Sequence, residues 1–356
     1  MGVDSGSQDV IPAAQPVADA ETAPKQPAPV SRWRLDAIVA ELRLSREVTH
    51  NIRPRGRFRR PPAREAISAI VEGLAASLFP AHYGGPELAV ESLDYFVGAT
   101  LNQSLARLVE QIRLSLSFAS ESEPDEAELA ARAHGIASDF AAQLPTIRGQ
   151  LVNDLRAAFT GDPAAAGFPE ILLGYPGMTA ILHYRLAHAL HELGAPLLAR
   201  LISEIAHSRT GIDIHPGARI GASFFIDHGT GVVIGATAII GERVRLYQAV
   251  TLGARHFPAD ENGALVKGAA RHPIIEDDVV IYAGATILGR IVIGRGSTIG
   301  GNVWLTRSVE AGSQITQAHA HKSPSARAKP PRGAKAPKRA EEVRAATNGG
   351  IAGSQL

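Results

Sequence analysis

Three short stretches of this chain bring imidazole, carboxylate and guanidinium side chains together. They are Asp213-Ile214-His215-Pro216, Asp227-His228-Gly229-Thr230-Gly231 and Arg271-His272-Pro273. A carboxylate near an imidazole fixes the tautomer of the ring and stabilises its protonated form, so the ring can accept a hydroxyl proton near neutral pH. The chain has no cysteine, which excludes a thiol nucleophile and thiolate metal ligands. We therefore predict that His228 acts as a general base on a hydroxyl group.

The elements that must position these groups follow from a six-residue repeat. Apolar residues recur at this interval in two runs: Ile214, Ile220, Ile226, Val232, Ala238, Val244 and Val250, then Ile275, Ile281, Ile287, Ile293, Ile299 and Leu305. This period fits neither an α-helix nor an alternating strand. It is typical of a parallel β-helix, in which three hexads close one triangular coil. We predict that the marked residue of each hexad points into the prism and stacks on its equivalents in neighbouring coils.

The spacing of two candidate catalytic residues fits this architecture. Asp213 and His228 are 15 residues apart, and three hexads make 18. A separation close to one coil predicts that the two side chains meet at an edge of the prism, where Asp213 would orient the ring. The polar, glycine-rich segment 254–273 interrupts the repeat. We expect it to form a loop that covers a groove between neighbouring prisms.

The rest of the chain divides where its composition changes. Residues 1–30 are polar and rich in alanine and proline, and we expect them to be disordered. Apolar residues at helical spacing dominate residues 31–208, which predicts an all-α domain before a β-helix over residues 209–318. Residues 319–356 are basic and predict a disordered tail. The predicted fold class is therefore α+β multidomain.

Composition also bears on location and partners. The N-terminal residues have no apolar core of the signal-peptide kind, and no stretch of about 18 apolar residues occurs, so we expect no signal peptide and no membrane span. The absence of cysteine fits a reducing compartment, and we expect a cytoplasmic protein. The basic stretch 53–62 has a single aromatic residue and no stacking repeat, so we interpret it as a solvated connector and expect no nucleic-acid partner.

The motifs around residues 213, 228 and 271 resemble serine O-acetyltransferase of the hexapeptide-repeat acyltransferase superfamily. The resemblance covers about residues 155–310, and the Asp-His-Xaa-Thr-Gly string at 227–231 is its most specific part. It implies a left-handed β-helix that transfers an acetyl group from acetyl-CoA to the hydroxyl of L-serine, giving O-acetylserine for cysteine biosynthesis. In that reaction His228 would be the general base and Asp213 would orient it.

The resemblance implies the remaining site residues and the partners. Asp162, Asp227, Arg271 and His272 would bind the ammonium and carboxylate groups of serine. Five small residues would let coenzyme A approach the backbone between two prisms: Gly253, Ala254, Ala283, Gly284 and Gly301. A homotrimer or a pair of trimers is implied, with each site pooled from two prisms. Many members bind O-acetylserine sulfhydrylase through a C-terminal isoleucine; this chain ends in Leu356, which argues against that complex.

Three other functions stay open at this point. Another hydroxyl acceptor, such as a sugar or a xenobiotic, would use the same base, although relatives of that kind usually lack the helical domain and the Arg271-His272 pair. The γ-type carbonic anhydrases share the trimeric prism, but they bind a metal through three histidines, two of them about five residues apart. Here His256 and His272 are 16 apart, so we expect no metal. A catalytically inactive scaffold is disfavoured by the presence of Asp213 and His228.

Overall fold

The computed structural model describes residues 33–52, 59–85, 88–121, 125–256 and 260–317. The chain divides into two compact units, residues 1–57 and 58–356. In the first unit, α1 (Leu35–Leu44) continues into the short π-helical segment η1 (Ser45–Thr49). The lead and the tail that we expected to be disordered, 1–30 and 319–356, lie outside the described residues.

The second unit begins with a series of helices. They are α2 (Arg64–Leu78), α3 (Pro80–Tyr83), the 3₁₀ turn η2 (Val90–Ser92), α4 (Leu93–Ala119), α5 (Glu126–Gly161), α6 (Phe168–Gly174), α7 (Pro176–Glu192) and α8 (Pro196–Thr210). Each long helix buries apolar residues at intervals of three and four, as the side chains at positions 67, 70, 71 and 74 of α2 show. The helical region ends at Thr210, close to the expected boundary at 208. Among the described residues, no helix is long and apolar enough to cross a membrane.

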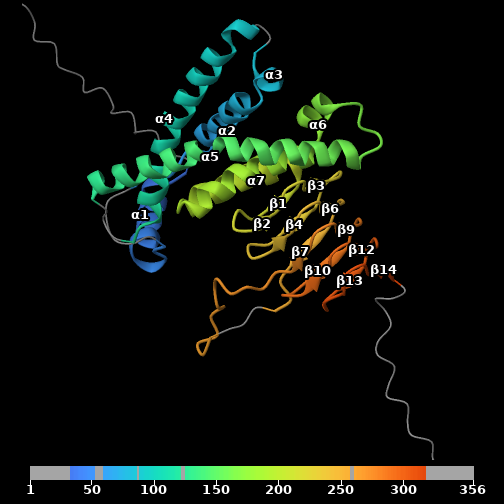
Figure 1. Ribbon diagram of the computed structural model, residues 1–356. Coiled ribbons are helices and arrows are strands. Elements are labelled where there is room, and N and C mark those ends of the chain that lie inside the picture. The colour runs from blue at the N-terminus through green and yellow to red at the C-terminus, as the bar shows by residue number, and fades with distance from the viewer. Residues whose placement is uncertain (1–32, 53–58, 86–87, 122–124, 257–259, 318–356) are drawn as a thin grey trace, which may run out of the picture. The chain divides into compact units, whose positions relative to one another are not determined.

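The second half of this unit is a left-handed parallel β-helix, as predicted (Figure 1). Its strands are β1 (Asp213–Ile214), β2 (Arg219–Ile220), β3 (Phe225–Ile226), β4 (Val233–Ile234), β5 (Ile239–Ile240), β6 (Arg245–Leu246), β7 (Thr251–Gly253), β8 (Ile274–Ile275), β9 (Val280–Ile281), β10 (Thr286–Leu288), β11 (Val292–Ile293), β12 (Thr298–Ile299), β13 (Trp304–Leu305) and β14 (Gln314–Ile315). Three parallel sheets form the faces of the prism. Sheet A has the order β1-β4-β7-β10-β13, sheet B has β2-β5-β8-β11, and sheet C has β3-β6-β9-β12-β14.

The phase of the predicted core is wrong at one corner. In sheet A, Ile214 pairs with Ile234, which pairs with Leu252 in the next coil. The inward residues Ile226 and Ile234 are therefore eight positions apart, because the corner between them holds two more residues than a hexad allows. Val232 does not belong to the same stack; it is buried at the corner itself. From β4 to β7, the residue two positions before each inward strand residue is also buried, and it recurs every six residues as well. In the sequence, the inward residues up to Ile226 and these corner residues from Val232 onward therefore look like one continuous repeat.

Helix α7 closes the first coil of the β-helix. The hydroxyl of Tyr184 donates to the carbonyl of Ala218 at 2.7 Å and accepts from the N–H of Ile220 at 3.1 Å. Arg185 donates to the Ile220 carbonyl at 2.7 Å and pairs with Asp154 of α5 at 3.0 Å, and both charged side chains are buried. Removing one partner of such a buried pair typically costs about 3–5 kcal/mol. The helices are thus fastened to one end of the stack, as Figure 1 shows.

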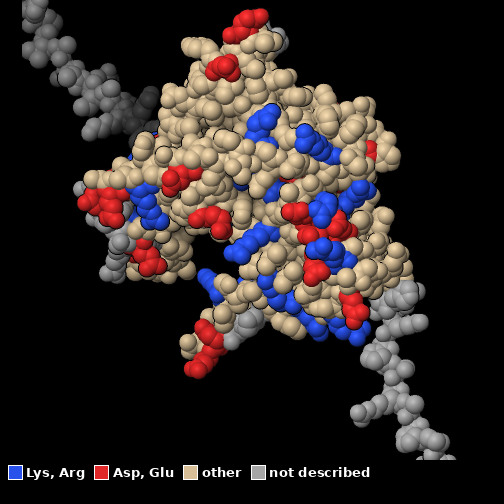
Figure 2. Space-filling view, in the orientation of Figure 1, with Lys and Arg blue, Asp and Glu red and all other residues tan. Residues whose placement is uncertain are grey.

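Charged side chains of both signs cover the outer face of the coils. Figure 2 shows basic and acidic groups interspersed there. Several pair between neighbouring coils, for example Arg243 with Asp278 at 2.6 Å and Arg295 with Asp277 at 3.2 Å. Exposed pairs of this kind contribute little stability each, about 0–1 kcal/mol. They keep the surface over these coils balanced in charge, in line with the net charge of +1 for the whole chain.

Candidate active site

The lengthened corner between sheets C and A carries the predicted general base. Three of its residues have left-handed backbone conformations: His228 at φ 58°, Gly229 at φ 86° and Gly231 at φ 80°. Histidine is one of the few residues other than glycine that is enriched in this region of backbone space. The ring of His228 projects from the corner, with 69% of its side chain exposed. The two extra residues of the corner therefore carry an imidazole out to the edge of the prism, where a substrate can reach it.

Asp227 holds a more protected place beside this ring. Its N–H donates to the carbonyl of Leu246 in the next coil at 2.9 Å, and its side chain is only 14% exposed. One carboxylate oxygen lies 3.8 Å from Nε2 of His228. The backbone ladder thus fixes a carboxylate next to an accessible imidazole.

Asp162 and Tyr175 approach this corner from the helical region. Asp162 follows the last residue of α5, and its Oδ1 accepts from the N–H of Ala164 at 2.8 Å, a local turn that aspartate favours. The hydroxyl of Tyr175 donates to Oδ2 of Asp162 at 2.6 Å. Tyr175 precedes Pro176, which begins α7 in the position where proline is favoured.

A close contact between α7 and β3 fixes this approach. Gly177 lies directly against the carbonyl of Ile226, and a Cβ at position 177 would overlap that oxygen. Only glycine allows the start of α7 to come so near the strand that precedes Asp227. The same contact holds Tyr175, two residues earlier, beside the corner.

The pKa values of these groups report their proximity. The hydrogen bond from Tyr175 is the main cause that lowers the pKa of Asp162, followed by the N–H of Ala164, with a smaller contribution from the charge of His228. The same hydrogen bond raises the pKa of Tyr175 to about 12, and the charge of Asp227 adds to this effect. Asp162, Tyr175, Asp227 and His228 therefore form one electrostatic group, which we call the open corner. Near neutral pH it contains a neutral phenol and an ionised Asp162.

Asp213 lies at the same edge of the prism, one coil above the open corner. Its N–H donates to the carbonyl of Val232 at 2.9 Å, and the N–H of Gly231 donates to the carbonyl of Gly211 at 2.8 Å. The ion pair that the structure gives to its carboxylate is with Arg200 of α8, at 3.4 Å. The structure places Asp213 and His228 on adjacent coils, and an orienting role of the carboxylate on the ring stays a prediction.

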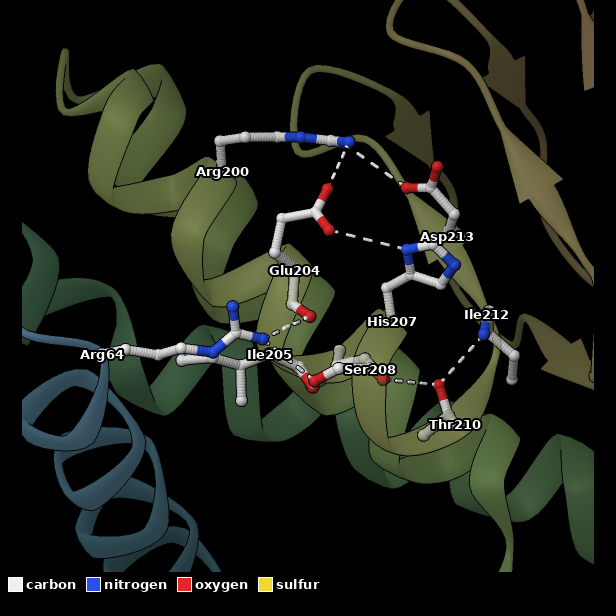
Figure 3. Close-up of polar contacts among 10 residues, drawn as sticks. Arg64, Arg200, Glu204, Ile205, His207, Ser208, Thr210, Ile212 and Asp213 are labelled. Carbon is white, nitrogen blue, oxygen red and sulfur yellow. Dashed lines mark hydrogen bonds and ion pairs between the residues drawn. The ribbon is translucent and has the colours of Figure 1, made fainter. Parts of the chain in front are cut away.

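Arg200 belongs to a polar network on α8 (Figure 3). It pairs with Glu204, one helical turn later, at 2.5 Å, and Glu204 lies 3.6 Å from Nδ1 of His207. Ligand atoms of Glu204, His207 and Asp213 all lie within 4.8 Å of one another, a spacing that could hold a metal ion. In this structure the cation that bridges the two carboxylates is the guanidinium of Arg200.

His272 occupies a different edge, between sheets A and B. The ring lies over Gly235, where a Cβ would overlap the ring atoms, and the residue is only 7% exposed. Thr237 accepts from the N–H groups of Arg271 and His272 at 2.9 and 3.2 Å. Arg290 donates to the carbonyls of Thr237 and His272 at 2.6 and 3.0 Å. We call this arrangement of Gly235, Thr237, His272 and Arg290 the His272 seat.

The seat fixes the protonation of the ring. The N–H of Thr237 donates to Nδ1 of His272 at 3.1 Å, so Nδ1 is an acceptor and the proton of the neutral ring is on Nε2. Burial lowers the pKa of His272 to about 4, and the charges of Arg271, His215 and Arg290 act in the same direction. Near neutral pH this histidine is a fixed, neutral hydrogen-bond donor.

The predicted site residues thus fall into two groups within one chain. Asp162, Asp227 and His228 lie together at the edge between sheets C and A, and Asp213 lies on the coil above them. Arg271 and His272 lie at the edge between sheets A and B, which follows from their place between β7 and β8. The residues predicted to contact coenzyme A divide in the same way: Ala283, Gly284 and Gly301 belong to the first edge, and Gly253 and Ala254 to the second.

Tyr175, Gly235, Thr237, Arg290 and Arg200 were not found from the sequence. Tyr175 had a weak signal, since it precedes a Pro-Gly pair at a helix start 13 residues after Asp162. Gly235 and Thr237 look like ordinary corner residues of the repeat. Arg200 looks like part of an exposed helix face, and only the path of the chain brings it to Asp213.

The fold and the site together define a class. A three-sided prism with a carboxylate-flanked histidine at its edge is the architecture of hexapeptide-repeat acyltransferases, and residues 272–307 match the family described as bacterial transferase hexapeptide (six repeats). The chain is 58% identical over 292 residues to "Serine acetyltransferase, plasmid" of Synechococcus elongatus, covering 80% of this chain and 91% of that protein. This chain therefore belongs to the serine acetyltransferase family and is an acyltransferase.

Two solved structures support the same assignment. Serine acetyltransferase 1 of Entamoeba histolytica, in complex with L-cysteine, is 38% identical with a TM-score of 0.61, covering 74% of this chain and 90% of that one. Isoform 3 of the same organism, in complex with cysteine, is 33% identical with a TM-score of 0.59, covering 84% and 96%. Both extend the similarity beyond the β-helix into the helical region.

Proposed function

We propose that this protein transfers the acetyl group of acetyl-CoA to the hydroxyl of L-serine, with His228 as the general base, giving O-acetylserine for cysteine biosynthesis. The observation that carries the proposal is the open corner. It places an accessible imidazole beside two carboxylates, Asp162 and Asp227. A hydroxyl compound with an ammonium group on the neighbouring carbon fits this combination, because the carboxylates attract the ammonium while the ring faces the hydroxyl.

The reaction proceeds by direct attack. His228 takes the proton of the serine hydroxyl as the oxygen attacks the thioester carbonyl of acetyl-CoA. The C–S bond then breaks, the coenzyme A thiolate leaves, and the imidazolium returns a proton to the sulfur. Asp213 orients the ring and stabilises its protonated form, which is the role of the carboxylate in such pairs. General acid–base catalysis of this kind contributes roughly 10²–10⁴ to the rate.

Tyr175 prepares Asp162 for the substrate ammonium. Its hydroxyl holds one carboxylate oxygen while the N–H of Ala164 holds the other. Each oxygen retains a lone pair for the ammonium. Because these bonds favour the ionised carboxylate, Asp162 is already charged before the substrate binds.

The carboxylate of serine is assigned to Arg271 and the neutral Nε2–H of His272. A guanidinium binds a carboxylate well because its N–H groups form a planar fork. These residues lie at a different edge of the prism from His228. We therefore propose a homotrimer, alone or paired, in which one edge of each prism faces the other edge of its neighbour. Each site then takes its base from one chain and its carboxylate-binding group from the next.

Coenzyme A is assigned to the same groove between prisms. Small residues on both edges, Ala283, Gly284 and Gly301 on one and Gly253 and Ala254 on the other, leave the backbone accessible to the pantetheine arm. We further propose that the reaction needs no metal and takes place in the cytoplasm. Metal analysis of the active protein and the effect of a chelator on turnover would test the first of these points.

An acceptor panel tests the proposal. L-serine, homoserine, a galactoside and water are each offered with acetyl-CoA, and release of the coenzyme A thiol is followed. We expect turnover with L-serine, weaker turnover with homoserine because its hydroxyl is one carbon further from the ammonium, and background release with the others. Preference for the galactoside would assign the open corner to a sugar acceptor. Equal release with water and serine would remove the acceptor assignment altogether.

A further inference from the structure

Asp213 has a neighbour that the proposed reaction does not use. The guanidinium of Arg200 lies 3.4 Å from Oδ1 of Asp213 through one nitrogen and 2.5 Å from the Glu204 carboxylate through another. Figure 3 shows the side chain of Arg200 reaching from α8 over Glu204 toward Asp213. A positive charge therefore stands beside the carboxylate that is assigned to support the catalytic ring.

The geometry of this contact is set by short and well-anchored connections. Gly211 ends α8 with φ 69° and its N–H donates to the carbonyl of His207 at 2.9 Å. The hydroxyl of Thr210 accepts from the N–H of Ile212 at 3.2 Å, so a hydrogen bond spans the short turn between α8 and β1. From the other side, Arg64 of α2 donates to the carbonyl of Glu204 at 3.2 Å. The helix that carries Arg200 and the strand that carries Asp213 are thus held in one relative position.

Other charged and titratable groups surround Asp213. They are Arg200, Glu204 and His207 of α8, His215 directly after β1, and, acting on His215, His191 of α7 and Arg271. Arg200 is the one whose ion pair with Asp213 the structure gives directly. Because 38% of the Arg200 side chain is exposed, its ion pair with Asp213 adds little to the stability of the fold. An anchored contact that adds little stability points to an effect on the site.

We propose that Arg200 is a positioning residue for the reaction: it fixes the Asp213 carboxylate and sets how strongly that carboxylate supports the imidazole of His228. The inference rests on the proposed function, since it assumes that Asp213 acts on His228. Arg200 competes with the imidazolium for the same negative charge. Glu204 moderates this competition because it shares the guanidinium.

The sign of each charge change follows from this arrangement. Loss of the positive charge in Arg200→Gln leaves Asp213 free to stabilise the protonated ring, so the base is protonated at higher pH. Loss of the negative charge in Glu204→Gln leaves Arg200 wholly on Asp213, so the base is protonated at lower pH. Arg200→Lys retains the charge and moves the profile least. At separations of this order in a partly exposed site, each shift is about half a pH unit.

The experiment is the pH profile of kcat/KM for serine with acetyl-CoA, whose acidic limb reports protonation of the base in the free enzyme. We expect the limb to move up in Arg200→Gln, down in Glu204→Gln, and hardly at all in Arg200→Lys. The matched control is Arg209→Gln, which removes an ion pair of 2.8 Å with Glu72 from the same helix. Limbs that stay in place in both Gln variants, or that move equally in the Arg209 control, would overturn the proposal.

Asp213→Asn separates the failure of this inference from failure of the proposed function. If Asp213→Asn loses activity and also removes the effect of Arg200→Gln on the limb, Arg200 acts through Asp213 as proposed. If Asp213→Asn loses activity but the two effects on the limb simply add, Arg200 acts by another route and only this inference is wrong. If Asp213→Asn keeps full activity, the orienting role of Asp213 in the proposed function is wrong, and the role of Arg200 is wrong with it.

Discussion

The open corner and the His272 seat each hold a histidine at an edge of the same prism, and they treat it in opposite ways. His228 sits on a lengthened corner, is 69% exposed and lies among carboxylates. His272 lies over Gly235, is 7% exposed and is surrounded by cationic side chains. The first environment leaves the ring open to substrate and solvent. The second keeps the ring neutral, because burial and positive charge both oppose protonation.

The difference shows how one repeat can build two kinds of site. A corner that gains residues pushes a side chain outward, into contact with substrate and solvent. A corner next to a residue without a Cβ draws a side chain inward, onto the face of the sheet. Proton transfer needs the former, while fixed recognition of a carboxylate suits the latter, since a buried ring of known tautomer loses little freedom when it binds.

The largest expected effect lies on the open side of this comparison. Replacing His228 by Asn removes the proposed base. Asn is a small polar residue that tolerates a left-handed backbone, so the corner is preserved. We expect kcat/KM for serine to fall about 10³-fold, within the range of general-base catalysis. Thiol release measures the change, and unchanged elution on size exclusion serves as the control. Retained turnover would show that another group takes the proton.

A smaller effect is expected from Tyr175→Phe, which removes only a hydroxyl from the open corner. Asp162 then loses the bond that orients one of its oxygens. A hydrogen bond to a charged group is worth about 1.5–3 kcal/mol, so the KM for serine should rise about tenfold or more. The KM for acetyl-CoA should change less than about twofold. Equal effects on both substrates would mean that Tyr175 supports the fold rather than the acceptor.

The His272 seat is tested by Gly235→Ala. The new Cβ occupies the place of the ring, so His272 must move or the strand must shift. Overpacking of this kind costs about 1–3 kcal/mol of stability, and displacement of the ring should raise the KM for serine severalfold. Thermal unfolding and kinetics measure the two effects. Gly85→Ala serves as the matched control, since no atom lies within 4 Å of the Cβ position there and its backbone is not left-handed. Unaltered serine kinetics in Gly235→Ala would place the carboxylate elsewhere.

The smallest expected effect is the contribution of His272 to the dependence of stability on pH. The pKa of His272 falls from 6.5 in the unfolded chain to about 4 in the folded one. Its contribution is therefore complete above pH 6.5 and is lost as the pH falls through about 4. His183 and His215 also have pKa values lowered by burial, so the total loss is shared among several groups. We expect the melting temperature of His272→Gln to fall less between pH 7 and pH 5 than that of the wild type, and identical slopes would contradict this.

The β-helix could be predicted from the sequence because its hexad repeat is regular. The hexad pattern predicted the β-helix and its place in the chain, because every apolar residue of the repeat is buried in the prism. The same regularity hid the two extra residues at the corner of His228. Val232 keeps the six-residue spacing after Ile226, although it occupies a different buried position from Ile226. The string around His228 and the Arg271-His272 pair were visible as motifs.

Contacts between distant parts of the chain could not be predicted in this way. Tyr175 reaches Asp162 only because Gly177 lets α7 press on Ile226. Arg200 reaches Asp213 only because the turn at Gly211 brings the helix back over the strand. The site residues could be assigned to their two edges only by counting the corners along the chain. That count requires the length of each coil, which the hexad pattern misjudged at the corner of His228.

The way that α7 covers the first coil has a consequence for how such molecules can vary. Tyr184 and Arg185 bond to the top of the stack, and the open corner belongs to that same coil. Coils at the far end, beyond β10, bear neither the base nor the groups that hold Asp162. A chain could gain or lose a turn there and change the reach of its groove while its proton-transfer geometry stayed intact. The number of coils can therefore change at one end of the β-helix without a change in the reactive groups at the other end.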